Sequence, residues 1–358
     1  MMAVTINGDT GVDKVVDNTI TTDDIQDGAI TSAKIASGAI PNSYAGTKNL
    51  IINGDMRISQ RGTSFTSNLE NTYTLDRWRI HDRNCTSRSV TQETFAVGSV
   101  STFGKEVQNY LRTTFSNDSG ATPPYVMQAI EDVRSAAGET ITLSFWAKAD
   151  AEQDIALHYS QQFGGGGSGE VTNIIDTITI GTSWAKYTTT VAIPSVSGKT
   201  IGTSSNLRID WRMPANTAIT YDMTLVQLEI GDTATPFENL QYTTQLQLCQ
   251  RYYHRINPDG TSGSIGSAAY YTSTTAFVSL NFPTSMRTSP SMEQVTGTDY
   301  YNINRNGAND TFNTFTLNTS NIDSADLYVA SGVSGNTGWA GRCRFNSASG
   351  YVAFSAEV

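Results

Sequence analysis

Short segments of alternating apolar and polar residues follow one another between residues 49 and 238. In residues 141–148 every second side chain is apolar, and Trp146 falls among the polar ones. Residues 207–212 repeat the pattern, with Arg208, Asp210 and Arg212 on the polar face. A period of two is that of a β-strand with one buried face. Clusters of Gly, Pro, Asn and Ser separate the segments, so the pattern predicts an antiparallel jelly-roll sandwich over residues 47–240.

A different period marks the N-terminal segment, where an aliphatic residue recurs at every fifth position. The six residues are Val15, Ile20, Ile25, Ile30, Ile35 and Ile40. Neither a helix nor a strand has this period, and the segment has too few apolar residues for a core of its own. We therefore expect residues 1–46 to form a repeat stalk, in which other copies of the chain cover these side chains. A disordered polar leader is the alternative.

The residues after 240 predict one helix followed by more β structure. Leu246, Cys249 and Tyr252 lie at helical spacing, which predicts a linker helix over residues 241–256. Residues 257–358 alternate again and predict a distal β-sandwich domain. Its expected loops carry Tyr270, Tyr271, Tyr300, Tyr301 and Trp339. Tyrosine among Asn, Ser and Gly is typical of recognition loops, and packing of these rings between subunits is the alternative.

Charge and composition exclude several classes of function. The formal net charge is −10 and no run of Lys or Arg offsets it, which argues against a nucleic-acid partner. We expect neither a signal peptide nor a membrane-spanning segment, because the sequence shows no apolar run of the required kind. The three cysteines, Cys85, Cys249 and Cys343, are far apart and predict buried thiols rather than disulfides or metal ligands. We expect no metal and no cofactor.

Catalysis finds little support in the sequence. The three histidines are scattered, and no nucleophile motif occurs. A glycosidase pair could still form in space among Asp76, Asp82, Glu131, Asp132 and Glu229. Most such carboxylates lie at turns and strand ends and are solvated, so we expect the protein not to be an enzyme.

Several motifs occur in an order that resembles a known family. They are residues 49–56, 59–62, 76–78, 143–148, 184–188, 226–231 and 235–238, with Asp76-Arg77-Trp78 as one example. Together they resemble a domain of tailed-bacteriophage tail fibres. Residues 248–253 and 282–290 resemble the junction and the distal domain of the same fibres.

The resemblance implies a homotrimeric virion protein, made in the host cytoplasm. Its N-terminus would bind a tail protein, and its C-terminal tip would bind a polysaccharide or protein of the host surface. It also implies a central domain like a carbohydrate-binding module. The expected function is adsorption to the host, with a structural connector or tail-tip protein and a polysaccharide-degrading tailspike as alternatives.

The implied sugar binding gives roles to individual residues. Trp146 is the best candidate for an aromatic platform, with a second core layer beneath a loop or a trimer contact as the alternative. Arg208, Asp210 and Arg212 could hold hydroxyl groups, although a solvated or inter-subunit salt-bridge face is the favoured interpretation. The sequence predicts core positions for the other tryptophans of the central domain, which are Trp78, Trp184 and Trp211. We expect the main receptor contacts at the tip, in the loops of Tyr270, Tyr271, Tyr300, Tyr301 and Trp339.

Overall fold

The computed structural model describes residues 48–358 apart from positions 68, 83–84, 117–122 and 261. The described residues belong to one compact unit. The predicted stalk, its trimer contacts and its side chains Val15, Ile20, Ile25, Ile30, Ile35 and Ile40 lie outside the described residues.

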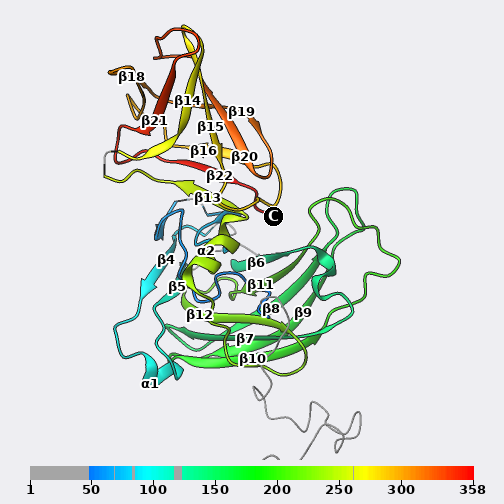
Figure 1. Ribbon diagram of the computed structural model, residues 1–358. Helices are drawn as coiled ribbons and strands as arrows, with labels where there is room; N and C mark the ends of the chain where they lie inside the picture. Colours follow the sequence, from blue (N-terminus) through cyan, green and yellow to red (C-terminus); the bar gives the residue numbers. More distant parts are fainter. Residues whose placement is uncertain (1–47, 68, 83–84, 117–122, 261) are drawn as a thin grey trace, which may run out of the picture. The chain divides into compact units, whose positions relative to one another are not determined.

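Two six-stranded antiparallel sheets make up the central part of the chain (Figure 1). The first sheet has the order β1-β4-β5-β12-β7-β10, and the second has the order β2-β3-β6-β11-β8-β9. The strands of the first sheet are β1 (Ser64–Phe65), β4 (Arg88–Thr94), β5 (Asn109–Phe115), β7 (Thr140–Ala149), β10 (Ala185–Ala192) and β12 (Ile219–Ile230). Those of the second are β2 (Thr72–Tyr73), β3 (Arg79–His81), β6 (Tyr125–Glu131), β8 (Gln153–Gln162), β9 (Val171–Ile180) and β11 (Asn206–Arg212). From β5 onward the chain changes sheet at every step except β8 to β9, which is the arrangement expected of a jelly-roll sandwich. The predicted antiparallel β architecture is confirmed.

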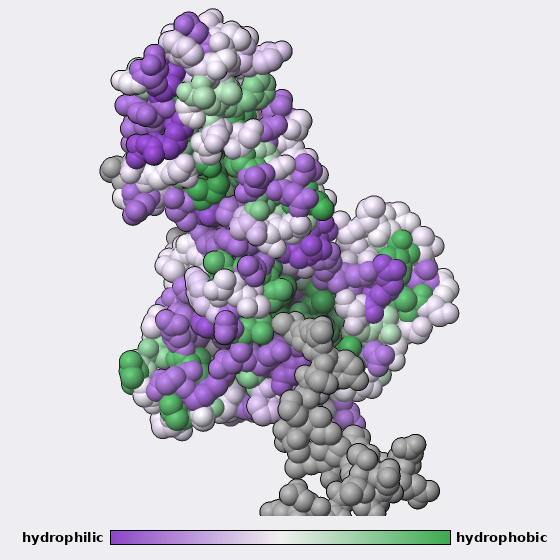
Figure 2. Space-filling view, viewed as in Figure 1, coloured by the Kyte–Doolittle hydropathy of each residue, from purple (hydrophilic) through white to green (hydrophobic). Residues whose placement is uncertain are grey.

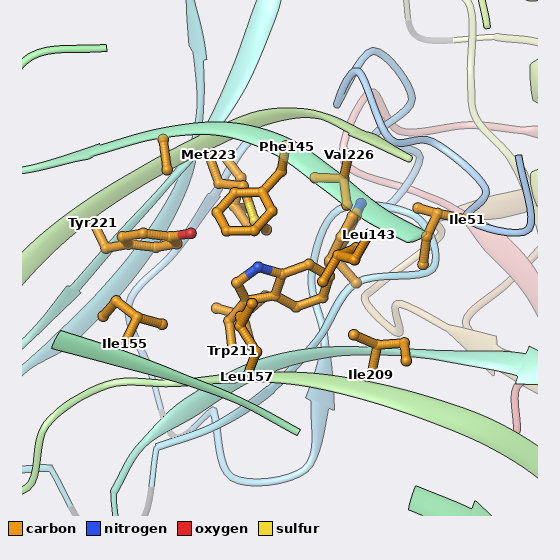
Figure 3. Close-up of a cluster of buried hydrophobic side chains, with 14 of the residues drawn as sticks. Ile51, Leu143, Phe145, Ile155, Leu157, Ile209, Trp211, Tyr221, Met223 and Val226 are labelled. Atoms are coloured by element: carbon orange, nitrogen blue, oxygen red, sulfur yellow. The ribbon is translucent and has the colours of Figure 1, made fainter. Parts of the chain in front are cut away.

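The core lies between these two sheets and consists of the apolar faces of their strands. In β7, Leu143 and Phe145 point inward and are buried. Trp211 of β11 meets them from the second sheet, with its ring centroid 5.9 Å from that of Phe145 (Figure 3). Trp78 packs edge-on against Trp211 at 5.6 Å. The predicted core positions of Trp78 and Trp211 are therefore confirmed.

The residues after 250 form two more antiparallel sheets around a second hydrophobic core. The three-stranded sheet has the order β13-β22-β16, and its strands are β13 (Tyr253–Ile256), β16 (Ser291–Gln294) and β22 (Val352–Ser355). The seven-stranded sheet has the order β18-β17-β21-β14-β15-β20-β19. Its strands are β14 (Ser264–Thr272), β15 (Thr275–Asn281), β17 (Tyr301–Arg305), β18 (Ala308–Phe312), β19 (Thr316–Ser320), β20 (Ser324–Val329) and β21 (Ala340–Phe345). The domain boundaries placed after residues 46, 240 and 256 stay predictions.

The linker helix is shorter than the sequence predicts. Helix α2 covers Tyr242–Gln250, and the chain then enters β13 instead of remaining helical to residue 256. Strand β13 pairs with β22, which places Tyr253 opposite Ser355. That partner lies roughly a hundred residues further along the chain, so a local spacing of apolar residues does not reveal it.

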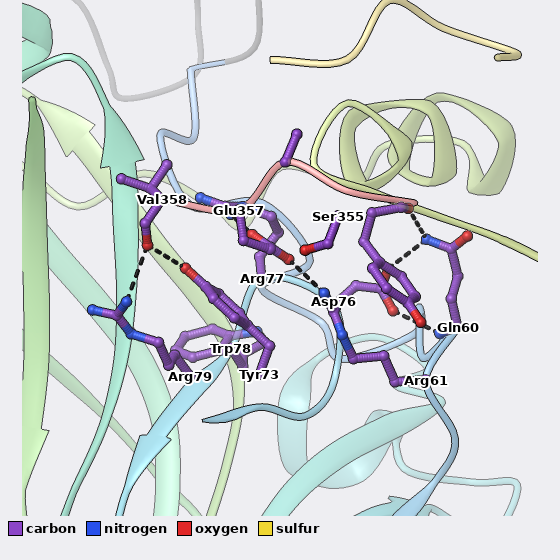
Figure 4. A network of polar contacts seen from close by, with 12 residues as sticks. Gln60, Arg61, Tyr73, Asp76, Arg77, Trp78, Arg79, Ser355, Glu357 and Val358 are labelled. Atoms are coloured by element: carbon purple, nitrogen blue, oxygen red, sulfur yellow. Dashed lines mark hydrogen bonds and ion pairs between the residues drawn. The ribbon is translucent and has the colours of Figure 1, made fainter. Parts of the chain in front are cut away.

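The last described residues bind the central sandwich through arginine side chains (Figure 4). Glu357 forms an ion pair with Arg77, and these side chains are only 6% and 1% exposed. The carbonyl oxygen of Val358 accepts a hydrogen bond from Arg79 at 3.0 Å and another from the Tyr73 hydroxyl at 2.6 Å. Burial, the largest single influence, lowers the pKa of the Arg77 guanidinium, but Glu357 together with Tyr73, Tyr252 and Cys249 outweighs it, so the pKa is raised. A buried pair of this kind ties the C-terminal strands to the sandwich.

The burial of His254 in β13 leads us to expect that the stability of the protein depends on pH. Burial lowers the pKa of His254 to about 4, whereas an unfolded chain has a histidine pKa of about 6.5. Between these values the unfolded state binds a proton that the folded state does not. The free energy of unfolding should therefore fall as the pH drops from about 6.5 toward 4, and level off below that.

Urea unfolding of the wild type and of His254→Gln at about pH 7 and about pH 4.5 measures this effect. The wild type should lose more stability than the variant over this interval. Parallel losses in the two proteins would show that His254 is not the responsible group.

Candidate functional site

Trp146 lies on the outer face of the first sheet, on the side of β7 away from the core. In the register, Lys186 of β10 is opposite Trp146 on one side and Thr224 of β12 is opposite it on the other. The side chain is partly exposed. The strand alternation predicts this outward direction, because neighbouring residues of a strand point to opposite faces.

Five aromatic rings gather on this outer face. Phe103 lies at their centre, with its ring centroid 4.9 Å from Trp146 and 5.5 Å from Trp184. Phe95 and Tyr110 complete the group, at 5.3 Å and 5.4 Å from Trp184. We call these five residues the aromatic cluster. Phe95 and Phe103 belong to the loop between β4 and β5, so this loop adds a second aromatic layer to the sheet.

A single helical turn fixes the position of Phe103. Helix α1 (Val100–Phe103) ends at Gly104, whose φ of 72° is one that glycine adopts at little cost. The Gly104 N–H donates to the Val100 carbonyl at 2.8 Å. The outer side of the loop is apolar, since Val97 and Val100 are 99% and 47% exposed. Figure 2 shows this corner of the molecule, where Figure 1 labels α1, as green patches.

Charged side chains in fixed positions flank the aromatic cluster on the same face. The two carboxylate oxygens of Asp222 each accept a hydrogen bond from Arg112 at 2.8 Å, and these bonds raise the pKa of the guanidinium. Lys148 Nζ lies 3.6 Å from Asp222 and 5.7 Å from the centroid of the Trp184 ring. Burial, followed by Asp222, raises the pKa of Tyr110, so its hydroxyl remains protonated. The aromatic cluster and the charged groups of Arg112, Lys148 and Asp222 thus lie side by side on the outer face of the first sheet.

A pocket of about 260 Å³ opens beside Trp146. Its apolar walls are Phe103, Trp146, Leu225, Pro236 and Phe237, and its polar lining includes Lys105, Ser144 and Lys186. A second pocket, of about 560 Å³, shares Lys105 and Leu225 with the first. Apolar walls with a few polar groups are typical of small-molecule sites. Phe103 covers one edge of Trp146 like a second core layer, while the pocket leaves the indole accessible from its own side.

The predicted core position of Trp184 is wrong. Tyr187 of β10 faces the core, since its ring centroid is 5.8 Å from that of Phe145. The even-numbered positions around it therefore face outward, and Trp184 lies among them. The same alternation could have identified Tyr110, the neighbour of the buried Leu111. Phe95 and Phe103 lie in a loop, where no alternation of apolar and polar residues shows the direction of a side chain.

Arg208, Asp210 and Arg212 lie on the outer face of the second sheet, so the structure does not bring them to Trp146. Asp210 is buried and accepts hydrogen bonds from Arg208 Nε at 2.7 Å and from Arg212 Nη2 at 2.9 Å. Both guanidinium groups lie within 6 Å of the Tyr125 ring, at 5.9 Å and 5.4 Å. Because the arginines are engaged with Asp210, this face is a salt-bridge face within one chain.

Three of the five residues expected in the tip loops lie in strands instead: Tyr270 and Tyr271 in β14, and Tyr301 in β17. Tyr270 and Tyr301 are 2% and 0% exposed and belong to the second core, so their prediction as ligand-binding residues is wrong. Tyr300 and Trp339 are partly buried against the same core. Tyr271 is 69% exposed. The period of a regular strand points two consecutive residues to opposite faces, and the different exposures of Tyr270 and Tyr271 agree with it.

None of the carboxylates considered for catalysis is among the described residues that line the pocket beside Trp146, and each has a partner. Asp76 accepts from Gln60, Asp82 pairs with Arg88, Glu131 with Arg251, Asp132 with Arg134, and Glu229 accepts from Thr235. Within the described ranges, no group of three His, Cys, Asp or Glu side chains could hold a metal ion. The three cysteines are buried free thiols, as predicted. No helix in the described part of the chain is long and apolar enough to cross a membrane.

No family model matches the chain, and no curated protein matches its sequence. Among solved structures, one similar domain is the N-terminal cellulose-binding domain of β-1,4-glucanase C from Cellulomonas fimi. The match covers 44% of this chain and 90% of that domain, with 12% sequence identity and a TM-score of 0.31. The CBM22-1 xylan-binding domain of Paenibacillus barcinonensis Xyn10C matches 53% over 100% of its length, with 11% identity and a TM-score of 0.33. The enzymatically active domain of tailspike protein 4 of bacteriophage CBA120 matches 51% over only 22% of its length, with 15% identity and a TM-score of 0.32. Similarity this low carries no argument about function, so the candidate site rests on its own geometry.

Proposed function

We propose that the outer face of the first sheet binds a glycan. Trp146 and Trp184 would contact the sugar rings, and the charged group of Arg112, Lys148 and Asp222 would hold hydroxyls. One observation carries this proposal: an aromatic cluster with an open pocket beside it and fixed planar polar groups on the same face.

The chemistry of a sugar suits this face. A pyranose has an apolar side of C–H groups and a rim of hydroxyls, so it needs an aromatic surface next to hydrogen-bonding groups. The bidentate Arg112–Asp222 pair keeps both partners in one orientation before any ligand arrives. Such preorganisation reduces the entropy that binding would otherwise cost.

We further propose that the chain is a tail fibre of a tailed bacteriophage and mediates adsorption to the host surface. The support is the order of motifs that resemble this family, from residues 49–56 to 282–290. In such a virion protein, residues 1–46 would bind a tail protein and help to hold a homotrimer. Three copies of a weak glycan site would then give firm attachment. We propose the flank of the sandwich rather than the tip for the receptor contacts, and the burial of Tyr270 and Tyr301 supports this choice.

Competition for host cells tests the proposal. Soluble protein added before the phage should reduce adsorption, and Trp146→Ala should lose this effect. Tyr271→Ala removes an exposed ring of the distal sheet and is the matched control, so it should compete like the wild type. Equal competition by all three proteins would place the receptor contacts elsewhere. If even the wild type neither binds cells nor competes, the protein is a structural connector.

A glycan-binding fibre should leave the host polysaccharide intact. We expect size-exclusion chromatography to show the same chain length before and after incubation with the purified protein. Shorter oligosaccharides, together with their loss on substitution of one Asp or Glu, would establish a tailspike enzyme instead.

A further inference from the structure

The pocket beside Trp146 is positively charged. Its charged side chains are Lys105 and Lys186, and no Asp or Glu occurs among its described lining residues. The other cations of this face, Arg112 and Lys148, are engaged with Asp222. Neither pocket lysine has an ion-pair partner of this kind in the described part of the chain. In a chain with a net charge of −10, this positive charge is a local feature.

Lys105 is the more constrained of the two lysines. Its Nζ lies 4.3 Å from the centroid of the Phe237 ring and donates a hydrogen bond to Asn239 Oδ1 at 3.1 Å. Burial lowers the pKa of Lys105, Asp55 opposes this shift and Arg57 adds to it. Neither the neutral amide of Asn239 nor the Phe237 ring carries a negative charge, so an anion could pair with this ammonium group.

The two lysines lie around an aromatic wall. Lys186 is exposed and directly opposite Trp146 in the β7–β10 register, and Lys105 follows Gly104 at the end of α1. A sugar lying against the Trp146 ring would thus have an ammonium group within reach on two sides. A neutral sugar would make the ring contact but leave both charges without a partner.

We infer that this pocket takes a sugar unit with an anionic substituent, so that the preferred ligand is an acidic polysaccharide. The inference rests on the proposed glycan binding and names the class of glycan. Lysine is a compact point charge that attracts a carboxylate and a sulfate alike. The shared requirement is one negative charge on the ring that contacts Trp146.

Calorimetric titration with three sets of short oligosaccharides tests the inference. They are hexuronate oligomers, the same oligomers after reduction of their carboxyl groups, and the reduced oligomers after sulfation. One of the two anionic sets should bind at least about tenfold more tightly than the neutral set. Added salt should diminish the preference, because the lysines are in contact with solvent.

Lysine variants link the preference to the pocket. Lys105→Gln should remove most of the preference for anionic oligomers, measured as the ratio of the affinities for the anionic and the neutral sets. Lys186→Gln provides the same comparison if the first variant does not fold. Lys199→Gln is the control, because Lys199 is an exposed lysine in the loop after β10, beside Phe163 and away from the pocket.

The outcomes separate the two proposals. Equal affinity for anionic and neutral oligomers would overturn the inference and leave glycan binding standing. A preference that survives both Lys105→Gln and Lys186→Gln would overturn it as well. Failure of all three sets and of host polysaccharide to bind would instead contradict the proposed function itself.

Discussion

Replacement of both Trp146 and Trp184 by alanine should weaken binding to host surface polysaccharide by about a hundredfold, as measured by calorimetry. Aromatic anchors in a binding site typically contribute about 2 kcal/mol or more each when truncated. Both tryptophans contact Phe103, at 4.9 Å and 5.5 Å. Their losses will therefore not add fully, because the first substitution already loosens the ring that they share.

The protein should remain folded in this variant, since both side chains lie outside the core between the sheets. Circular dichroism and the urea midpoint check this point. Tyr271→Ala is again the matched control, and its affinity should equal that of the wild type. Loss of affinity in Tyr271→Ala, with full affinity in the double variant, would return the receptor site to the distal sheet.

Glu357→Ala should lower the free energy of unfolding by about 3 kcal/mol or more. The substitution leaves the Arg77 guanidinium buried without its carboxylate, and Arg77 is only 1% exposed. Its remaining contacts are a hydrogen bond to the Ala129 carbonyl and the Tyr252 ring, whose centroid is 3.5 Å away. Neither contact neutralises the charge, so the cost is that of an unpaired buried cation. Urea unfolding followed by tryptophan fluorescence measures the change.

Two further variants show whether the buried charge is the cause. Arg77→Met combined with Glu357→Leu removes both charges and should be more stable than Glu357→Ala alone. Arg134→Ala breaks the exposed pair with Asp132 and should leave the urea midpoint unchanged. A double variant as unstable as the single one would show that packing of the last residues, and not charge, is what Glu357 provides.

The sequence predicted the features that depend on local alternation. The inward Leu143 and Phe145 and the outward Trp146 follow from a period of two, and the structure agrees. The same period places Trp184 on the outer face and gives consecutive tyrosines opposite directions. The core position expected for Trp184 and the binding role expected for the buried Tyr270 and Tyr301 therefore do not follow from it.

Features that depend on distant partners could not be predicted in this way. Phe103 reaches Trp146 from a loop whose single helical turn has no periodic signal. Residues 253–256 lie at the end of the predicted linker helix but form a strand, because β22 supplies a pairing edge. The Arg77–Glu357 pair joins residues 280 positions apart. In each case the deciding contact is tertiary, and tertiary contacts override local propensity.

The five tryptophans allow one measurement that tests glycan binding at the aromatic cluster directly. Trp146 and Trp184 belong to the cluster, Trp78 and Trp211 lie in the core, and Trp339 lies in the distal part. Fluorine NMR of protein labelled with fluorotryptophan, each signal assigned by substitution, follows all five during titration with host polysaccharide. Binding at the cluster predicts shifts of the Trp146 and Trp184 signals, with those of Trp78, Trp211 and Trp339 unchanged. A shift of Trp339 while Trp146 and Trp184 stay constant would contradict it.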